Sequence, residues 1–328
     1  MKKLNLFLSA ALIMAASVMF AQGLSPQAPL PGNVTLTPAP AAADCGDCTI
    51  DQIVRVIPFG SQNVNDIYQR GHENDANVLQ EGLGNKSYIT QDGDDANGMG
   101  GFFNTAKVYQ EGVHNYSLIN QDGDRNNGIV IQTGDLNYAK QSNIGVGWAE
   151  ENDAYINQDG TGNAAVQTQY YDNNEARIDQ DGTNNETTQY QSSGPLNQAA
   201  GSYASSIQFG TDNMVSQRQI GSFNNARTEQ SGIGNKSNEV QTAGSYLGSG
   251  FLTNLSRVFQ DGDNNTNCLT QAEGFTGANY NYVYQLGDLN FAKVNQNANN
   301  LGSSWNMSGI TQLGDSNKAC VDQNSGSF

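Results

Sequence analysis

The chain has 328 residues and a net charge of −17 at neutral pH, an acidic balance that excludes the basic surface of a nucleic-acid-binding protein. Only 14% of its residues are charged and its mean hydropathy is −0.56, so uncharged Asn, Gln, Gly and Ser supply most of the polarity. Such a composition is typical of disordered chains, but a strict 11-residue period along most of this one argues against disorder.

Residues 1–21 have the pattern of a secretory signal peptide. Lys2 and Lys3 form its basic end, and residues 4–20 form its apolar stretch. A transmembrane helix is the alternative, and the lack of a stop-transfer flank disfavours it. We therefore expect an exported chain.

Residues 22–57 are expected to be an export or linker segment without a core of its own. Five of the seven prolines lie in residues 22–44, which favours an extended chain. Cys45 and Cys48 form a CxxC, for which a local disulfide is favoured over a metal half-site or a redox pair. Residues 49–57 read as a strand that leads into the repeats. Pro58 stands 11 residues before Gln69, where an earlier Gln of the repeat would fall.

From residue 58 to residue 323, Gln recurs in the pattern Gln-x-Gly-x-x-Asn-x-Ala-x-x-x-Gln, mostly every 11 residues. Of 21 such anchor positions 20 are Gln, and Asn143 is the exception. The residue six before each anchor is Asn in 20 cases, with Ser202 as the exception. One small structural unit stacked many times explains this period.

Each unit resolves into a strand and a turn. In residues 85–91, one side of the strand carries Asn85, Ser87, Ile89 and Gln91. The other side carries Lys86, Tyr88 and Thr90. The inward side holds small and aliphatic residues between the Asn and the Gln, and the outward side is mixed and polar. Gly stands two residues after most anchors, where a tight reversal needs a positive φ.

Two strands and two turns make a coil of 22 residues, which predicts an all-β, two-sheet parallel β-solenoid of about ten coils. The Asn and Gln side chains of successive coils then lie about 4.8 Å apart and form ladders of amides. The predicted amyloid ladder comprises Gln69, Asn74, Gln80, Asn85, Gln91, Gln110, Asn115, Gln121, Asn126, Gln132, Gln158, Asn163, Gln169, Asn174, Gln180, Asn185, Gln191, Gln208, Asn213, Gln219, Asn224, Gln230, Asn235, Gln241, Gln260, Asn265, Gln271, Gln285, Asn290, Gln296, Gln312, Asn317 and Gln323.

Six intervals between anchors are longer than 11 residues. They follow anchors 3, 7, 11, 15, 17 and 19, all odd, so every insert should leave from the same edge of the stack. The inserts contain aromatic residues that form either a binding edge or a cover folded back over the solenoid. These aromatics are Phe102, Phe103, Trp148, Tyr203, Tyr246, Phe251, Phe275 and Trp305.

Part of the predicted core is polar. At the usual aliphatic position, odd-numbered strands carry Gln141, Gln167, Gln189, Gln217 and then Glu239. Stacked amides can satisfy each other, whereas a buried carboxylate cannot, so we expect Glu239 to be protonated or reached by solvent. Cys268 and Cys320 should point outward two coils apart, too far for a disulfide with each other.

Catalytic and metal chemistry have little support in the sequence. His72 and His114 fall in turns without a repeated partner, and no nucleophile–base arrangement is apparent. We therefore predict no enzyme activity and no cofactor. Asp–Gly–Asp turns are weak calcium candidates, and turn chemistry explains them without a metal. They are Asp92 with Asp94, Asp122 with Asp124, and Asp261 with Asp263.

The repeat pattern resembles the curlin repeat of curli subunits, for example in Gln110–Gln121 and Gln158–Gln169. The resemblance covers about four-fifths of the chain. It implies export through an outer-membrane pore, nucleated polymerisation into extracellular amyloid fibres, and roles in adhesion and biofilm formation. The family's short export segment corresponds loosely to residues 22–57, while the number of repeats, the inserts and the cysteines depart from the family pattern.

Two functions remain open at this point. In the first, the chain is a fibre subunit, major or nucleating, because the five residues 324–328 form no cap and the bare last strand would recruit another copy. Its expected partners are a second copy of itself, a nucleator subunit and an outer-membrane pore. In the second, it is a monomeric surface solenoid that binds a carbohydrate, or a host or matrix surface, through the aromatic inserts.

Overall fold

A computed structural model describes residues 48–55, 60–92, 102–144, 151–194, 200–243, 254–273, 277–298 and 305–324. By its internal contacts the chain divides into Met1–Ala42 and Ala43–Phe328, and all described residues belong to the second unit. The expected signal peptide therefore lies outside the described residues. Within them the regular structure is β-strand, and no helix could cross a membrane.

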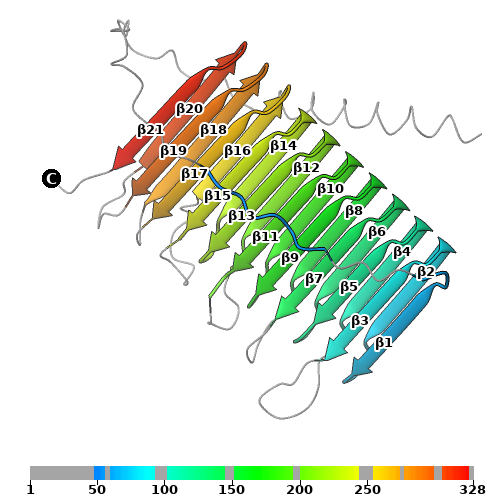
Figure 1. Cartoon of the computed structure of the whole chain (residues 1–328). Helices are drawn as coiled ribbons and strands as arrows, with labels where there is room; N and C mark the ends of the chain where they lie inside the picture. Colours follow the sequence, from blue (N-terminus) through cyan, green and yellow to red (C-terminus); the bar gives the residue numbers. More distant parts are fainter. Residues whose placement is uncertain are drawn as a thin grey trace, which may run out of the picture. The chain divides into compact units, whose positions relative to one another are not determined.

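The strands form two sheets that alternate along the chain (Figure 1). The 11-stranded sheet contains β1 (Val64–Arg70), β3 (Lys86–Asp92), β5 (Tyr116–Gln121), β7 (Tyr138–Ile144), β9 (Ala164–Tyr170), β11 (Glu186–Ser192), β13 (Met214–Ile220), β15 (Lys236–Thr242), β17 (Thr266–Glu273), β19 (Phe291–Ala298) and β21 (Lys318–Asn324). The 10-stranded sheet contains β2 (Asp75–Leu83), β4 (Thr105–Val113), β6 (Asn127–Asp135), β8 (Asp153–Thr161), β10 (Glu175–Thr183), β12 (Tyr203–Thr211), β14 (Asn225–Ile233), β16 (Asn254–Asp261), β18 (Ala278–Leu286) and β20 (Trp305–Leu313).

Every neighbouring pair of strands is parallel, and anchors pair with anchors. Gln69 lies opposite Gln91 between β1 and β3, and Gln80 lies opposite Gln110 between β2 and β4. This register keeps each inward side chain in the core, since a slip of one residue would turn it to solvent. The predicted two-sheet parallel β-solenoid is confirmed.

The apolar core is divided into two clusters along the stack. Ile89, Ile119 and Ile178 belong to the first, and Val258 and Leu269 belong to the second. All five side chains are buried, and their aliphatic groups stabilise the facing sheets by excluding water. Between the clusters the core is polar, as the Gln141–Glu239 row predicts.

Glycine turns let the coils approach closely. Gly112 has φ of 119°, and a Cβ at this position would lie 2.0 Å from the carbonyl oxygen of Gly134 in the next coil. No side chain fits in such a gap, so the stacking of turns selects glycine for space as well as for backbone conformation.

The connections longer than five residues follow β3, β7, β11, β15 and β19, so they leave from the 11-stranded sheet, as predicted. After β17 only four residues separate the strands, because β17 itself continues to Glu273. Trp148, Tyr246, Phe251 and Phe275 lie outside the described residues. The assignment of Tyr203 and Trp305 to inserts is wrong, because they begin β12 and β20. Insert length shows where extra chain lies, but not at which residue the next strand starts.

Residues 48–55 correct two predictions. They form no strand; they extend over the outer face of the 11-stranded sheet instead (Figure 1). Cys48 forms a disulfide with Cys268 in β17, 220 residues away, so the predicted local disulfide with Cys45 is wrong. Cys320 is disulfide-bonded as well. We call residues 48–55 the strap.

Candidate assembly site

A continuous ladder of Gln amides runs through the 10-stranded sheet. Each Nε2 donates to the Oε1 of the Gln in the next strand, as from Gln110 to Gln132 at 2.8 Å. The second amide proton goes to a backbone carbonyl, in this case that of Lys86 at 3.1 Å. The ladder joins Gln80, Gln110, Gln132, Gln158, Gln180, Gln208, Gln230, Gln260, Gln285 and Gln312.

The matching ladder in the 11-stranded sheet is broken once. It joins Gln69, Gln91 and Gln121, and then Gln169, Gln191, Gln219, Gln241, Gln271, Gln296 and Gln323. At the break, both polar side-chain atoms of buried Asn143 and the Oε1 of Gln169 have no hydrogen-bond partner. Asn is one methylene shorter than Gln and does not span the gap between coils.

The regularly spaced Asn residues bind backbone groups rather than forming a simple amide ladder. The backbone N–H of Asn115 donates to Oδ1 of Asn85 at 3.0 Å, and Nδ2 of Asn115 donates to the carbonyl oxygen of Gly134 at 2.7 Å. Farther along the stack, a direct amide bond is added, as from Nδ2 of Asn235 to Oδ1 of Asn213 at 3.1 Å. Asn at this position therefore closes each turn onto the next coil.

Both ends of the described stack expose edge strands. β1 and β2 at one end, and β20 and β21 at the other, have a strand neighbour on one side only. Ile67 in β1 is 38% exposed, whereas Ile89, its partner in register, is 1% exposed. An apolar inward residue is thus left uncovered where the stack stops.

A family profile described as Curlin associated repeat matches residues 65–95 and 104–134. These two stretches carry curlin repeats. The matched ranges include most of β1–β3 and of β4–β6, and the register carries the same inward pattern to β21. Curlin-repeat proteins are structural fibre subunits rather than enzymes. A search among curated proteins gives no match to this chain.

Inside the stack, a third ladder crosses the polar part of the core. Gln141, Gln167, Gln189 and Gln217 are buried and bond in sequence, at 3.0 Å from Gln167 to Gln189 and 2.9 Å from Gln189 to Gln217. Each also donates to a carbonyl of the facing sheet, as Gln167 does to Tyr155 at 3.0 Å. These bonds replace water and allow amides to occupy a core position.

Glu239 ends this ladder. Its carboxyl is fully buried, and burial raises its pKa, against a lowering by hydrogen bonds to Oε1 from Thr228, Gln217 and Ser237. Its Oε2 has no hydrogen-bond partner. A neutral, protonated carboxyl fits this environment better than a carboxylate does, which agrees with one of the two predicted outcomes for Glu239.

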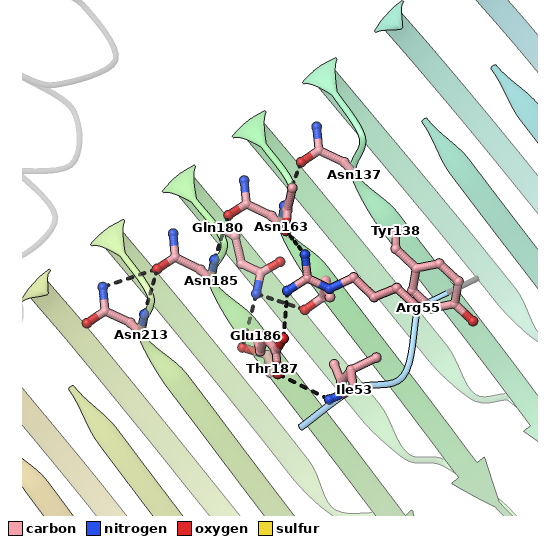
Figure 2. A network of polar contacts seen from close by, with 12 residues as sticks. Ile53, Arg55, Asn137, Tyr138, Asn163, Gln180, Asn185, Glu186, Thr187 and Asn213 are labelled. Atoms are coloured by element: carbon pink, nitrogen blue, oxygen red, sulfur yellow. Dashed lines mark hydrogen bonds and ion pairs between the residues drawn. The ribbon is translucent and has the colours of Figure 1, made fainter. Parts of the chain in front are cut away.

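The strap is held by charge as well as by its disulfide (Figure 2). The guanidinium of Arg55 lies 2.6 Å from Oε1 of Glu186 in β11 and also donates to the carbonyl oxygen of Gly162. The backbone N–H of Ile53 donates to the other oxygen of Glu186 at 3.1 Å, and Asn238 in β15 donates to the carbonyl of Thr49 at 3.0 Å. The strap therefore ties β11, β15 and β17, and the turn that precedes β9, together.

Sequence reasoning missed the role of Glu186 and Arg55. The two residues are 131 positions apart, and each is a lone charge among mixed outward residues. Only the CxxC pointed to this region, and the cysteine that pairs with Cys48 lies in a distant repeat.

The calcium candidates and histidines make structural contacts. Oδ1 of Asp124 accepts the N–H of Phe102 at 2.8 Å, and Oδ1 of Asp263 accepts the N–H of Ile233 at 2.9 Å. Within the described ranges, no group of three or more His, Cys, Asp or Glu residues could hold a metal ion; Asp94 is outside them. The ring of His72 stacks on Phe102 at 5.4 Å.

Outward aromatic residues also stack along the axis. Tyr116 and Tyr138 lie with ring centroids 5.2 Å apart on the 11-stranded sheet, and Tyr280 and Trp305 lie 5.7 Å apart on the 10-stranded sheet. Phe103 is 53% exposed. These contacts follow the spacing of successive strands and add to the stacking of coils.

Proposed function

We propose that the chain is a secreted structural subunit that self-assembles end to end into curli-like amyloid fibres of the extracellular matrix, where it serves adhesion and biofilm formation. The observation that carries this proposal is the open strand edge at both ends of the described stack. Unpaired strand edges template the pairing of another chain, and curlin-repeat proteins are fibre subunits. A nucleator subunit and an outer-membrane export pore belong to the same proposal.

The hydrogen-bonding groups at the two ends are complementary. Every Gln–Gln hydrogen bond of the two outer ladders runs from an Nε2 to the Oε1 nearer the C-terminal end, so Oε1 of Gln69 and of Gln80 receives no donor from the described residues. At the other end, Nε2 of Gln312 and Nε2 of Gln323 each use one proton on a carbonyl oxygen, of Phe291 and Met307. The second proton of each amide can donate to the Gln of a following copy.

Fibre formation by the full chain tests the proposal directly. Purified protein should assemble after a lag, give a meridional reflection near 4.8 Å, and lose the lag when preformed fibres are added. A chain that stays monomeric at high concentration and ignores seeds would disprove the proposal.

A variant of the last strand sharpens this test. Asp322 is an outward residue of β21, and outward N–H groups point to the next coil, as the N–H of Phe291 does to Asn317. Asp322→Pro removes a donor that the monomer does not use, so elongation should fail while the solenoid stays folded. Asp322→Ala keeps the donor and is the matched control, which should elongate normally.

A further inference from the structure

The described stack contains an odd number of strands, 11 in one sheet and 10 in the other. The last strand, β21, belongs to the same sheet as the first, β1. The next vacant position in the stack is therefore on β20, in the 10-stranded sheet. From this parity we infer that a second copy adds with its β1 on β20 and its β2 on β21, rotated by half a turn about the stacking axis. This inference rests on the proposed end-to-end assembly.

The unrotated alternative leaves a gap. If β1 of the second copy paired with β21, its β2 would lie in line with β20 but one strand position away from it, so the 10-stranded sheet would lack one strand at the junction. The edges of β20 and of the incoming β2 would then face each other across an empty position, with their backbone groups unpaired. Unpaired backbone groups are costly when neighbouring strands exclude water.

The inward residues match in the rotated arrangement. With Gln69 placed on Gln312, Ile67 of the second copy lies on Ile310 of the first. With Gln80 placed on Gln323, the pairs are Ala76 on Ala319 and Val78 on Val321. In the unrotated arrangement Asn65 would lie on Ala319 instead, so a buried amide would face a methyl group.

The outward residues add charge complementarity. The same register places Asp75 of the second copy beside Lys318 of the first, whereas the unrotated register places it beside Met307. Opposite charges on adjacent strands attract, and the pair fixes the register of approach.

The turns fit as well. Gln69 and Asn74 are five residues apart, as are Gln312 and Asn317, so the turn after β1 has the length of the turn after β20. Gly71 and Gly314 take the same place in these turns, with φ of 111° and 87°. Nothing lies within 4 Å of a Cβ placed on Gly314, whereas a Cβ placed on Gly287, in the preceding coil, would lie 2.6 Å from the carbonyl oxygen of Gly314. Gly71 of the second copy would continue this column of glycines.

The arrangement has a visible consequence for the fibre. The strap lies on the 11-stranded sheet only, and the longer connections leave from that sheet. With each copy rotated by half a turn, straps and inserts alternate between opposite sides of the fibre. Since consecutive strands advance by about 2.4 Å, 21 of them give about 50 Å per copy.

Electron cryo-microscopy of seeded fibres of the full chain tests this inference. The expected result is a rise of about 50 Å per copy, a rotation of half a turn added to the twist of the solenoid, and straps on alternating faces. Fibres with all straps on one face would overturn the inference and leave the proposed function intact. A complete lack of fibres would overturn the proposed function and this inference with it.

Charge exchange at the junction is a second, independent test. Asp75→Lys and Lys318→Asp should each slow seeded elongation several-fold, because each places like charges side by side. The double variant should regain most of the wild-type rate. Asp66→Lys, which faces Gly309 in the rotated register, is the control and should show no rescue by Lys318→Asp. If the double variant elongates no faster than the single variants, the register is wrong.

Discussion

Gln121 and Asn143 lie opposite each other in register between β5 and β7, yet no hydrogen bond joins their side chains. Every other anchor pair of the two sheets lies within a ladder except the pair of Asn143 with Gln169 on its other side. One residue type at one position thus divides the ladder of the 11-stranded sheet into a short part and a long part.

Asn143→Gln should therefore stabilise the protein. The longer side chain would accept from Gln121 and donate to Gln169, and it would satisfy buried groups that now have no partner. Because a buried polar group without a hydrogen-bond partner costs about 1–3 kcal/mol, we expect a gain of that order in the free energy of unfolding. Denaturant titration of the monomer measures it. The converse variant, Gln241→Asn, breaks a complete part of the ladder and should lose stability. A loss for both variants would show that space, and not length, sets the choice at residue 143.

Much of this architecture is predictable because the period repeats the same information many times. Anchors such as Gln80 and Gln110 set the register, and the inward aliphatic residues, such as Ile89 and Ile119, then follow. The strap was not predictable in this way. Cys48 and Cys268 are 220 residues apart, no repeat relates them, and the short spacing of Cys45 and Cys48 favoured a local bond.

The contacts of the Asn residues show a second limit. The period places Asn85 and Asn115 on adjacent strands, but it does not show whether an amide binds another amide or a backbone N–H. The geometry of the turn decides this. In the first coils, Oδ1 of each Asn accepts the backbone N–H of the Asn in the next coil, as from Asn115 to Asn85 and from Asn137 to Asn115.

Glu239→Gln should make stability less dependent on pH. Burial raises the pKa of Glu239 in the folded protein, so the folded state binds more protons than the unfolded state above the ordinary pKa of Glu, near 4.3. The stability that this proton binding contributes is fully present below that pH, and it is lost as pH rises through the pKa of Glu239 in the folded protein. Gln removes the titration and extends the Gln141–Gln217 ladder, so the variant should be more stable than wild type at neutral pH.

Denaturant titrations from pH 4 to pH 8 measure this difference. Glu229→Gln is the control, since Glu229 lies in an exposed ion pair with Arg227 outside the core. An equal response of both variants to pH would remove Glu239 as the cause.

Release of the strap should be measurable by trypsin. Arg55 is a cleavage site, but its side chain is only 22% exposed beside Glu186. Glu186→Gln weakens the contacts of both Arg55 and Ile53. A loss of about 1.4 kcal/mol there would raise the open population, and hence cleavage after Arg55, by about tenfold.

Reduction of the Cys48–Cys268 disulfide should add to this effect, because it frees the other end of the strap. Glu229→Gln again serves as the control, since it leaves the strap contacts intact. Cleavage at one rate in wild type, in Glu186→Gln and after reduction would show that the strap is not closed in solution.

Gly160→Ala should destabilise the solenoid strongly. Gly160 has φ of 113°, and a Cβ there would lie 2.1 Å from the carbonyl oxygen of Gly182, a backbone atom that cannot move without opening two coils. Strain of this backbone conformation alone costs about 1–3 kcal/mol, so we expect a loss of at least that size in the free energy of unfolding.

Gly309→Ala is the matched control: nothing lies within 4 Å of its Cβ position, and alanine in a strand interior is favoured over glycine. Monomer stability should therefore stay constant or rise in Gly309→Ala. If Gly160→Ala were equally well tolerated, the close approach of successive turns would not be what selects glycine in this repeat.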